Sequence, residues 1–375
     1  MRIGISTRGL NRGSYAISSI VYYLGCEIVK LAADRHEIYL YINDPDHLEL
    51  FGPSVHKRHY KLENRFLWDQ VWLPQAMRKD ELDVALFMKG TLPVLLPCQG
   101  AVIFHDLGYF DESLRPYRFL ESIYMRTMMS VAGRKAGHIF ADSEYTRQEA
   151  IRIMNLDPRK VSVCYQNCSP IYRLIEVQSE LEAVRRRYGL PPKFMFGPIS
   201  LSPRKNLGRI LDAFGRVKDH IPHHIVLTGG QSWRHRGLVK RIAAEFNQRV
   251  TVLGQVPQED MPALYNLADF TIYPSLLEGF GLPVLEAFRC GCPALTSDVT
   301  SLPEVAGEAA YLVDPYDVEQ IADGMLRLAT DPELRQDLVE KGFQRAKLFS
   351  WERTARIILD GFERLGPSLS RLPEG

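Results

Sequence analysis

Two carboxylates flank a glycine-rich turn in the second half of the chain, in the run Glu278-Gly-Phe-Gly-Leu-Pro-Val-Leu-Glu286. Pro283 suits the first position of a helix, because the backbone N–H that it lacks would be unpaired there, so we expect Leu282 at the cap and Glu286 in the first turn. The glycines open the backbone to an anion, which would meet the free N–H groups at the helix start. A carboxylate on each side of an anion site fits a phosphate-bearing sugar.

A basic pair stands at a second predicted strand end. Ser200-Leu-Ser-Pro-Arg204-Lys205-Asn206 follows the apolar run 194–196 and precedes a helical pattern. Cations are disfavoured at a helix start, so a merely solvated basic turn is the weaker alternative. Arg204 and Lys205 can instead stabilise the negative charge that grows on a departing phosphate.

Three further groups follow or precede predicted elements. His105 comes directly after the apolar run 101–104, followed by Asp106, which suits a turn or helix cap. A lone histidine is often structural, but its place at a strand end favours a functional role. The other two groups are the loop Gly254-Gln255-Val256 after run 250–253, and Gly13-Ser14 before the first long helix.

Short apolar runs alternate with amphipathic segments along nearly the whole chain, which indicates parallel sheets with helical crossovers. The predicted strands are 2–6, 37–42, 83–87, 101–104, 138–141 and 161–164 in the first half, and 194–196, 224–227, 250–253, 270–273, 293–296 and 310–313 in the second. A first helix is predicted over 15–31. The pattern breaks between about 169 and 192, which favours two α/β domains in a chain of 375 residues.

Together these runs resemble the retaining glycosyltransferases of family 4, whose signature is E-x7-E. The resemblance continues through Cys292-Pro-Ala-Leu-Thr-Ser-Asp298 and Ser301-Leu-Pro-Glu304. It implies the GT-B fold, in which two doubly wound Rossmann-like domains face an interdomain cleft. The acceptor-side domain would be 1–170, joined by a C-terminal helix at about 351–375, and the nucleotide-sugar domain would be 190–350.

The resemblance also implies roles for the residues. Glu278 would lie against the donor sugar, Glu286 would accept hydrogen bonds from ribose hydroxyls, and His105 would lie at the donor–acceptor junction. Gly13 and Ser14 would form a loop near donor phosphate or acceptor. The implied catalytic residues are His105, Glu278 and Lys205, and the implied donor-binding residues are Arg204, Lys205, Gly254, Gln255, Val256, Glu278, Phe280, Gly281, Leu282 and Glu286.

This chain departs from the family pattern in three places, and at one of them Cys168 follows Asn167 where the family commonly has glycine. Family members usually carry Gly-Arg or Gly-Ser shortly before the basic motif, where this chain has Pro198-Ile199-Ser200, so Arg204 would take over the missing arginine's part. The first loop has only Gly13 where a second glycine is common.

The expected enzyme is a metal-independent hexosyltransferase without a cofactor. It would move a hexose, with GDP-mannose as the first choice and a UDP-hexose as the second, to a hydroxyl of a glycan, glycolipid or small glycoside. Epimerases and phosphorylases with similar sheets, and a sugar-nucleotide-binding subunit without turnover, stay open as alternatives. A Rossmann dehydrogenase is disfavoured because no Gly-x-Gly-x-x-Gly follows the first predicted strand.

Composition bounds the partners and the compartment. A net charge of +1 gives no argument for nucleic acid, and the six cysteines form no Cys-x-x-Cys pair, which favours free thiols in a reducing cytoplasm. No run approaches the length of a membrane span. Segments 66–73 and 116–135 mix aromatic, methionine and basic residues and suit either a peripheral contact at the inner face of a membrane or core packing. Acidic Asp69 and Glu121 interrupt the basic face and favour core packing.

Overall fold

The computed structural model describes residues 1–8, 10, 15–62, 64–114, 117, 119–199, 202–230, 236–246 and 248–366. The chain divides into two compact units. The first comprises Met1–Asn167 with Phe349–Gly375, and the second comprises Cys168–Leu348. Segment 171–189, which the sequence left between its two predicted domains, belongs to the second unit and carries a helix.

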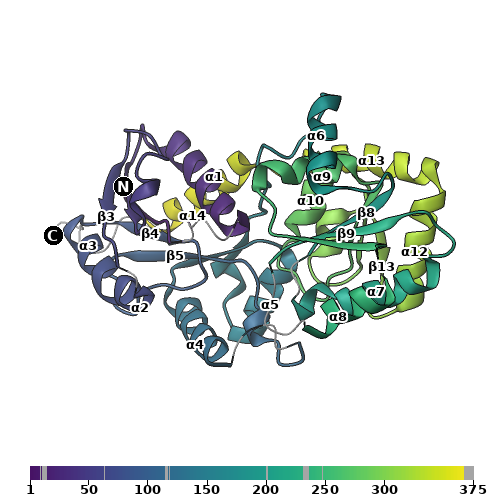
Figure 1. Cartoon of the computed structure of the whole chain (residues 1–375). Coiled ribbons are helices and arrows are strands. Elements are labelled where there is room, and N and C mark those ends of the chain that lie inside the picture. The colour runs from purple at the N-terminus through teal and green to yellow at the C-terminus, as the bar shows by residue number, and fades with distance from the viewer. Residues whose placement is uncertain are drawn as a thin grey trace, which may run out of the picture. The chain divides into compact units, whose positions relative to one another are not determined.

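The first unit is built on a parallel sheet in the order β3-β2-β1-β4-β5-β6-β7 (Figure 1). Its strands are β1 (Arg2–Ser6), β2 (Glu37–Ile42), β3 (His56–His59), β4 (Val84–Phe87), β5 (Gln99–Phe104), β6 (His138–Ala141) and β7 (Val161–Val163). The inner strands are buried on both faces, as near-continuous apolar runs require.

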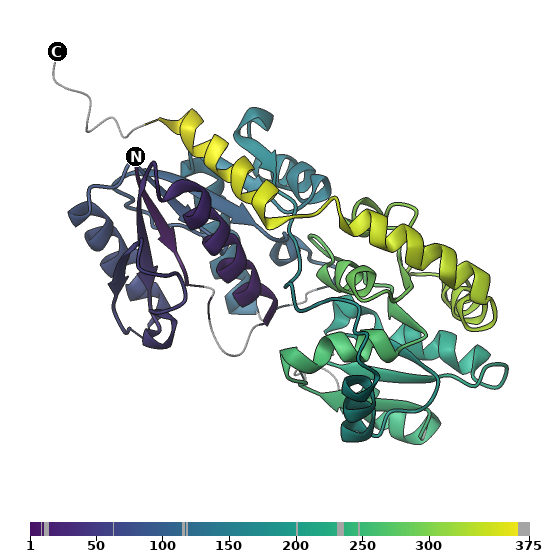
Figure 2. The same cartoon turned by 90° about the horizontal axis from the view of Figure 1, so that it is seen from above.

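Helices cover both faces of this sheet. They are α1 (Tyr15–Ala32), α2 (Arg65–Leu67), the π-helical turn η2 (Trp68–Trp72), α3 (Leu73–Lys79), α4 (Phe119–Lys135), α5 (Glu144–Met154) and α14 (Trp351–Leu365). Side chains of η2, α3, α4 and α5 share one core cluster with β2, β4, β5 and β6. Helices α1 and α14 pack on each other and lie over the opposite face (Figures 1 and 2).

The second unit repeats the architecture with a parallel sheet in the order β10-β9-β8-β11-β12-β13. Its strands are β8 (Phe194–Pro198), β9 (His224–Thr228), β10 (Val250–Gly254), β11 (Phe270–Tyr273), β12 (Ala294–Ser297) and β13 (Tyr311–Val313). Its helices are α6 (Gln178–Tyr188), α7 (Leu207–Val217), α8 (Arg236–Glu245), α9 (Met261–Leu267), α10 (Leu282–Arg289), α11 (Leu302–Ala306), α12 (Val318–Thr330) and α13 (Pro332–Ala346). Short 3-10 turns include η5 (Pro203–Lys205).

The last helix returns the chain to the first unit. Ser350 caps α14 by accepting a hydrogen bond from the Arg353 backbone N–H at 3.1 Å. Gly361 lets the helix approach β6 closely, because a Cβ there would lie 2.6 Å from the Phe140 ring. The predicted C-terminal helix over 351–375 is therefore present as α14, which ends at Leu365.

One packing prediction is partly wrong. Trp68, Met128 and Met129 are buried, as core packing of segments 66–73 and 116–135 requires. The start of α4 is not packed, because Phe119 is 77% exposed and Leu120 is 78% exposed. The acidic residues that favoured core packing serve other contacts: Asp69 pairs with a cation within the unit, and Glu121 accepts from a tyrosine hydroxyl.

Candidate functional site

The carboxylate of Glu278 lies at the centre of a buried polar cluster in the second unit. Its Oε1 atom accepts hydrogen bonds from Lys205 Nζ at 2.6 Å, from Tyr273 OH at 2.9 Å and from Ser275 Oγ at 2.5 Å. Lys205 Nζ also contacts the Tyr273 hydroxyl. Arg204 Nη1 lies 3.9 Å from the other oxygen, Oε2. Three residues that the sequence singled out separately, Arg204, Lys205 and Glu278, thus form one site.

Sheet topology explains this meeting. Strands β8 and β11 are neighbours, and from this pair the chain winds outward to β9 and β10 on one side and to β12 and β13 on the other. Lys205 follows β8 and Glu278 follows β11, so both lie beyond the carboxyl ends of the two central strands. This reversal of strand order is the place where doubly wound sheets bind ligands.

The basic motif is tied to the carboxylate loop by backbone contacts. Asn206 adopts the left-handed conformation with φ of 62°, which asparagine tolerates well. Its Nδ2 donates to the carbonyls of Pro274 at 3.0 Å and Pro315 at 2.6 Å. The Arg204 carbonyl accepts from the Leu276 N–H at 2.7 Å. These bonds hold the cations against the loop that carries Glu278.

The cations decide the charge of Glu278. Burial alone would raise the pKa of this carboxyl, but Lys205 and Arg204 oppose that cost and lower the pKa to about 2. Glu278 is therefore ionised at neutral pH. The site holds one buried negative charge beside two positive charges. The cations can stabilise negative charge in a substrate, and the carboxylate can stabilise positive charge.

Helix α10 begins one residue earlier than predicted. Leu282 is its first residue and Gly281 is the cap, so Pro283 takes the second position and Glu286 the fifth, beyond the first turn. Gly281 has φ of 108°, and a Cβ there would lie 2.6 Å from Leu302 Cδ2. A glycine at the cap therefore sets the helix start, which the proline alone does not reveal.

Ser301 fixes the loop before α10 by hydrogen bonds to its backbone. Its buried hydroxyl contacts two carbonyl oxygens, that of Glu278 at 3.1 Å and that of Phe280 at 2.9 Å. The Phe280 side chain is itself buried, at 4% exposure. Phe280, Gly281 and Leu282 therefore contribute a fixed stretch of backbone directly beside Glu278.

Glu286 lies in a different environment from Glu278. Its Oε2 accepts a hydrogen bond from Tyr265 OH at 2.8 Å, and the Tyr172 hydroxyl also bonds to this carboxyl. Burial raises the pKa of Glu286 to about 7, although both tyrosines and Lys205 act in the opposite direction. The carboxyl can therefore gain or lose a proton near neutral pH.

The predicted loop at the end of β10 presents mainly backbone. Gly254 has φ of 73°, and a Cβ at this position would meet open space. Its carbonyl accepts from the Gly229 N–H at 2.8 Å, which joins the ends of β9 and β10. Gln255 is exposed and Val256 is buried. This geometry suits contact through the backbone with a flat group.

In the first unit, His105 is fixed by both ring nitrogens. Phe104 and Ala141 are paired in register, so the residues after them, His105 and Asp142, lie side by side. His105 Nδ1 lies 2.8 Å from Asp142 Oδ2, and Nε2 lies 2.6 Å from the Met88 carbonyl oxygen. Burial alone would lower the pKa of His105, but Asp142 and the Met88 carbonyl raise it above its usual value. Gln166 Nε2 also lies 2.9 Å from Nδ1 and donates to Asp142 Oδ2, so it helps to hold the pair.

His105 also lines a pocket of about 610 Å³ within the first unit. Arg8 and Lys89 enter it after β1 and β4, the two strands at the reversal of strand order in this sheet. Tyr109 and Tyr117 stack with ring centroids 3.9 Å apart. The remaining lining residues are Asn64, Phe66, Gly90, Asp106, Glu121, Tyr124, Met125 and Met129. Flat aromatic faces beside polar groups suit a sugar ring.

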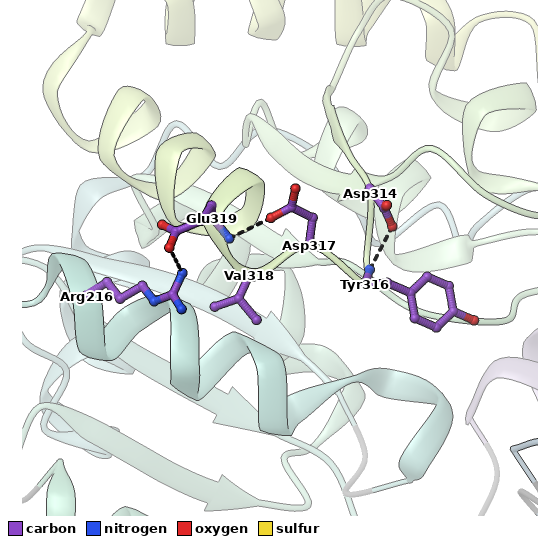
Figure 3. Close-up of a pocket in the computed structure, with 6 residues that line it drawn as sticks. All are labelled: Arg216, Asp314, Tyr316, Asp317, Val318 and Glu319. Carbon is purple, nitrogen blue, oxygen red and sulfur yellow. Dashed lines mark hydrogen bonds and ion pairs between the residues drawn. The ribbon is translucent and has the colours of Figure 1, made fainter.

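Another hollow, of about 410 Å³, lies on the second unit between α7 and α12 (Figure 3). Arg216 there pairs with Glu319, and Asp317 caps α12 by accepting from the Glu319 N–H at 2.8 Å. Asp314 accepts from the Tyr316 N–H at 2.8 Å. These charges serve the local fold, so we do not assign the hollow to the site.

Comparison with known proteins shows the family of this chain. The profile described as glycosyl transferases group 1 matches residues 185–345, which include the whole Glu278 cluster. O-antigen chain mannosyltransferase B of Escherichia coli is 31% identical over 272 residues, covering 71% of each chain. The chain belongs to the glycosyl transferases group 1 family. It is a glycosyltransferase.

Other relatives and solved structures agree with that membership. The serotype-specific mannosyltransferase WbdA of Escherichia coli is 30% identical over 291 residues, which cover 75% of this chain but 35% of the relative. Sucrose-phosphate synthase of Thermosynechococcus elongatus has a TM-score of 0.76 at 18% identity, over 97% of this chain and 98% of that one. HepE of Anabaena, solved with UDP and glucose, has a TM-score of 0.73 at 16% identity, over 97% and 100%. The structural matches confirm the GT-B fold.

Some sequence predictions on this glycosyltransferase stay untested. Gly13 and Ser14 lie outside the described residues, as does Ser200 of the basic motif. Within the described part of the chain, no group of three His, Cys, Asp or Glu side chains could hold a metal ion, and no helix has the length and apolar character to cross a membrane.

Sequence reasoning missed the residues that position the site. Asp142 directly follows a predicted strand, as His105 does, and that shared signal was available. Tyr273 is the last residue of β11, where the sequence shows only an apolar strand. Tyr172 and Tyr265 come from segments remote from Glu286 in sequence, so only the folded chain brings their hydroxyls to its carboxyl.

Proposed function

We propose that this glycosyltransferase moves a hexose from a nucleotide diphosphate sugar to a hydroxyl of a glycan, with retention of the anomeric configuration. GDP-mannose is the first donor proposed and a UDP-hexose the second. The mannosyltransferase names of its relatives support mannose. The observation that carries the proposal is the contact of Lys205 with Glu278 at the strand reversal of the second unit.

In this proposal the donor lies along the run from Gly254 to Glu286. The loop Gly254-Gln255-Val256 contacts the base through its backbone, which is open at Gly254. Glu286 accepts hydrogen bonds from the ribose hydroxyls in its ionised form. The backbone of Gly281 and Leu282 and the cations Arg204 and Lys205 bind the diphosphate, with charge-assisted hydrogen bonds of about 1.5–3 kcal/mol each.

The chemistry follows from charges that are already fixed. As the bond from sugar to phosphate breaks, Lys205 and Arg204 stabilise the negative charge that grows on the departing phosphate. Ionised Glu278 stabilises the positive charge that develops at the anomeric carbon. Attack from the same face, with the departing phosphate taking the acceptor proton, would retain configuration. No carboxylate nucleophile is invoked.

The acceptor is proposed to bind in the first unit. Both ring nitrogens of His105 bond within the unit, so the ring would contribute its positive charge, and the stacked Tyr109 and Tyr117 offer a flat face for a sugar ring. Arg8 and Lys89 are balanced by Asp106 and Glu121 in the same pocket, which favours an uncharged sugar. A lipid-linked glycan that is extended in polysaccharide biosynthesis is the acceptor form proposed.

The test is transfer from a panel of donors. Purified chain is incubated with GDP-mannose, UDP-glucose and UDP-galactose and with mannosyl glycoside acceptors, and the product's anomeric configuration is read by NMR. The proposal expects an α-linked product, retaining the donor's configuration, with GDP-mannose favoured. An inverted product would overturn retention. Donor binding without transfer to any acceptor would instead indicate a binding subunit.

Thermal shift separates binding from turnover. A donor at a hundred times its dissociation constant stabilises the folded chain by about 2.7 kcal/mol if it binds only that state. We expect this shift with the guanosine donor and a smaller one with uridine donors. An equal absence of shift with all of these sugar nucleotides would contradict the donor site.

A further inference from the structure

Tyr273 joins the two charged groups Lys205 and Glu278, although its own side chain carries no charge. It is 1% exposed, and its hydroxyl contacts both Lys205 Nζ and Glu278 Oε1. Lys205 Nζ also lies 4.6 Å from the centre of the Tyr273 ring. One uncharged side chain therefore touches both a cation and the anion of the site.

The direction of both hydrogen bonds follows from the protons that are present. A lysine ammonium has donors but no acceptor, and an ionised carboxylate has acceptors but no donor. The Tyr273 hydroxyl must therefore accept from Lys205 and give its one proton to Glu278. Burial and the charge of Glu278 raise the pKa of Tyr273 well above its usual value, so the hydroxyl keeps this proton at neutral pH.

The two oxygens of the Glu278 carboxylate have different surroundings. Oε1 accepts from three donors, which are Lys205 at 2.6 Å, Tyr273 at 2.9 Å and Ser275 at 2.5 Å. A carboxylate oxygen offers about two lone-pair sites, so these three donors saturate Oε1. Arg204 Nη1 lies 3.9 Å from Oε2, which is beyond hydrogen-bond length. A sugar hydroxyl would therefore donate to Oε2.

The backbone of Tyr273 is itself fixed by the sheet. Tyr273 is the last residue of β11 and pairs in register with Thr296 of β12. Its carbonyl accepts from the Ser275 N–H at 2.8 Å and from Thr296 Oγ1 at 3.0 Å. Lys205, by contrast, carries its charge at the end of a flexible aliphatic stem. The fixed tyrosine can therefore determine where the lysine ammonium lies.

We propose that Tyr273 is a positioning residue of the transfer reaction, which fixes the Lys205 ammonium and occupies Glu278 Oε1, so that Oε2 binds the donor sugar. This inference rests on the proposed function, which gives both charges their substrate. The effect is greatest as charge develops on the substrate, because a transition state is stabilised by groups that are already in place. Tyr273 acts through these two residues and not by contact with the donor.

Tyr273→Phe in the full chain tests this role, because it keeps the ring beside Lys205 and removes only the hydroxyl. The matched control is Tyr41→Phe in the first unit. Tyr41 is also buried, and its hydroxyl donates to Asp80 Oδ2 at 2.9 Å, a carboxylate that pairs with Arg58. Both variants lose a buried hydrogen bond to an ion-paired carboxylate, so both should melt at a lower temperature than the unaltered chain.

Of these two variants, Tyr273→Phe alone should slow the reaction. With GDP-mannose we expect its kcat to fall about 10–100-fold, since a small displacement of a catalytic charge has an effect of this size. The dissociation constant for GDP should change by less than about threefold, because the flexible Lys205 can still reach a bound diphosphate. Tyr41→Phe should leave both constants unchanged. A kcat for Tyr273→Phe that matches the Tyr41→Phe value would overturn the proposal.

A double variant shows whether the hydroxyl acts through Glu278. If it does, removal of the hydroxyl should matter much less once Glu278→Gln has removed the negative charge. The combined loss in kcat should then be at least about fivefold smaller than the product of the two single losses. A combined loss equal to that product would overturn the positioning role.

The position of Lys205 can also be measured without turnover. Lysine side chains with isotope-labelled Cε atoms are observed by NMR, and the Lys205 signal is identified by its absence from Lys205→Arg. We expect this signal to shift in Tyr273→Phe and to stay unchanged in Tyr41→Phe. Absence of transfer to any acceptor by the unaltered chain would overturn the proposed function, while the NMR signal would still decide whether the hydroxyl fixes Lys205. An unshifted signal in Tyr273→Phe would overturn the inference.

Discussion

Glu278 and Glu286 lie eight residues apart and have pKa values pushed in opposite directions, to about 2 and about 7. Burial acts to raise the pKa of both carboxyls, so the difference comes from their partners. Lys205 and Arg204 face Glu278, whereas Tyr265 and Tyr172 face Glu286. A permanent charge suits the reacting sugar, and a carboxyl that titrates near neutrality suits reversible binding of hydroxyls.

Glu286 gives a prediction on stability and pH. Its pKa is about 7 in the folded chain and near 4.5 when unfolded, so between these values the folded state holds the extra proton. The free energy of unfolding should therefore fall as pH rises from about 4.5 to 7, by about 3 kcal/mol. Glu286→Gln cannot titrate and should remove this fall. Urea unfolding at several pH values checks it, and parallel curves for the two proteins would contradict it.

The same titration bears on the donor. Ionised Glu286 is the form proposed to hold the ribose, so donor affinity should rise as pH increases through about 7. Glu286→Gln should bind the donor more weakly and without that dependence.

His105 gives a second prediction at this scale. Asp142 raises the pKa of the imidazole, so Asp142→Asn should lower it. Stability from charged His105 is complete below pH 6.5 and is lost as pH rises through the folded pKa. Imidazole NMR titration measures this directly. His138, which contacts Ser162 instead, is the internal control, and an unshifted His105 would refute the pairing.

At the scale of elements, the start of α10 is the most constrained backbone of the site. Gly281→Ala places a Cβ at φ of 108° and 2.6 Å from Leu302, so we expect a loss of about 1–3 kcal/mol and lower turnover. Gly208→Ala in α7 is the matched control. Its Cβ meets nothing within 4 Å, and it should stabilise by about 0.5–1 kcal/mol. Equal melting temperatures for both variants would contradict this account.

Apolar periodicity predicted nearly every strand, because buried parallel strands are continuous apolar runs. It missed β3, His56-Lys-Arg-His59, a polar edge strand that carries no such signal. Propensity placed Pro283 at the first helical position, but the cap is Gly281, with φ of 108° and no room for a Cβ beside Leu302, so the helix begins one residue earlier. The sequence singled out Arg204, Lys205 and Glu278, which the structure brings together, whereas Tyr172 and Tyr265 reach Glu286 only through the tertiary fold.

At the scale of the whole molecule, the stability of the first unit depends on α14, which comes from the C-terminal part of the chain. Truncation after Leu348 removes the helix that packs on α1 and β6. Hydrogen exchange should then rise in α1, β5 and β6, while β8 and β11 keep their protection. Equal loss of protection in both units would contradict the prediction that only the first unit depends on α14 for its stability.

The central claim is that ionised Glu278, held by Lys205, acts on the donor sugar. Glu278→Gln keeps the shape and removes the charge, and Glu333→Gln, at an exposed position of α13, is the matched control. Circular dichroism and melting first establish that both are folded at the assay temperature. The decisive measurement is kcat with GDP-mannose and a mannosyl acceptor. We predict a fall of about 10²–10³ for Glu278→Gln and none for the control; a kcat within about twofold of the unaltered enzyme for Glu278→Gln would contradict the account.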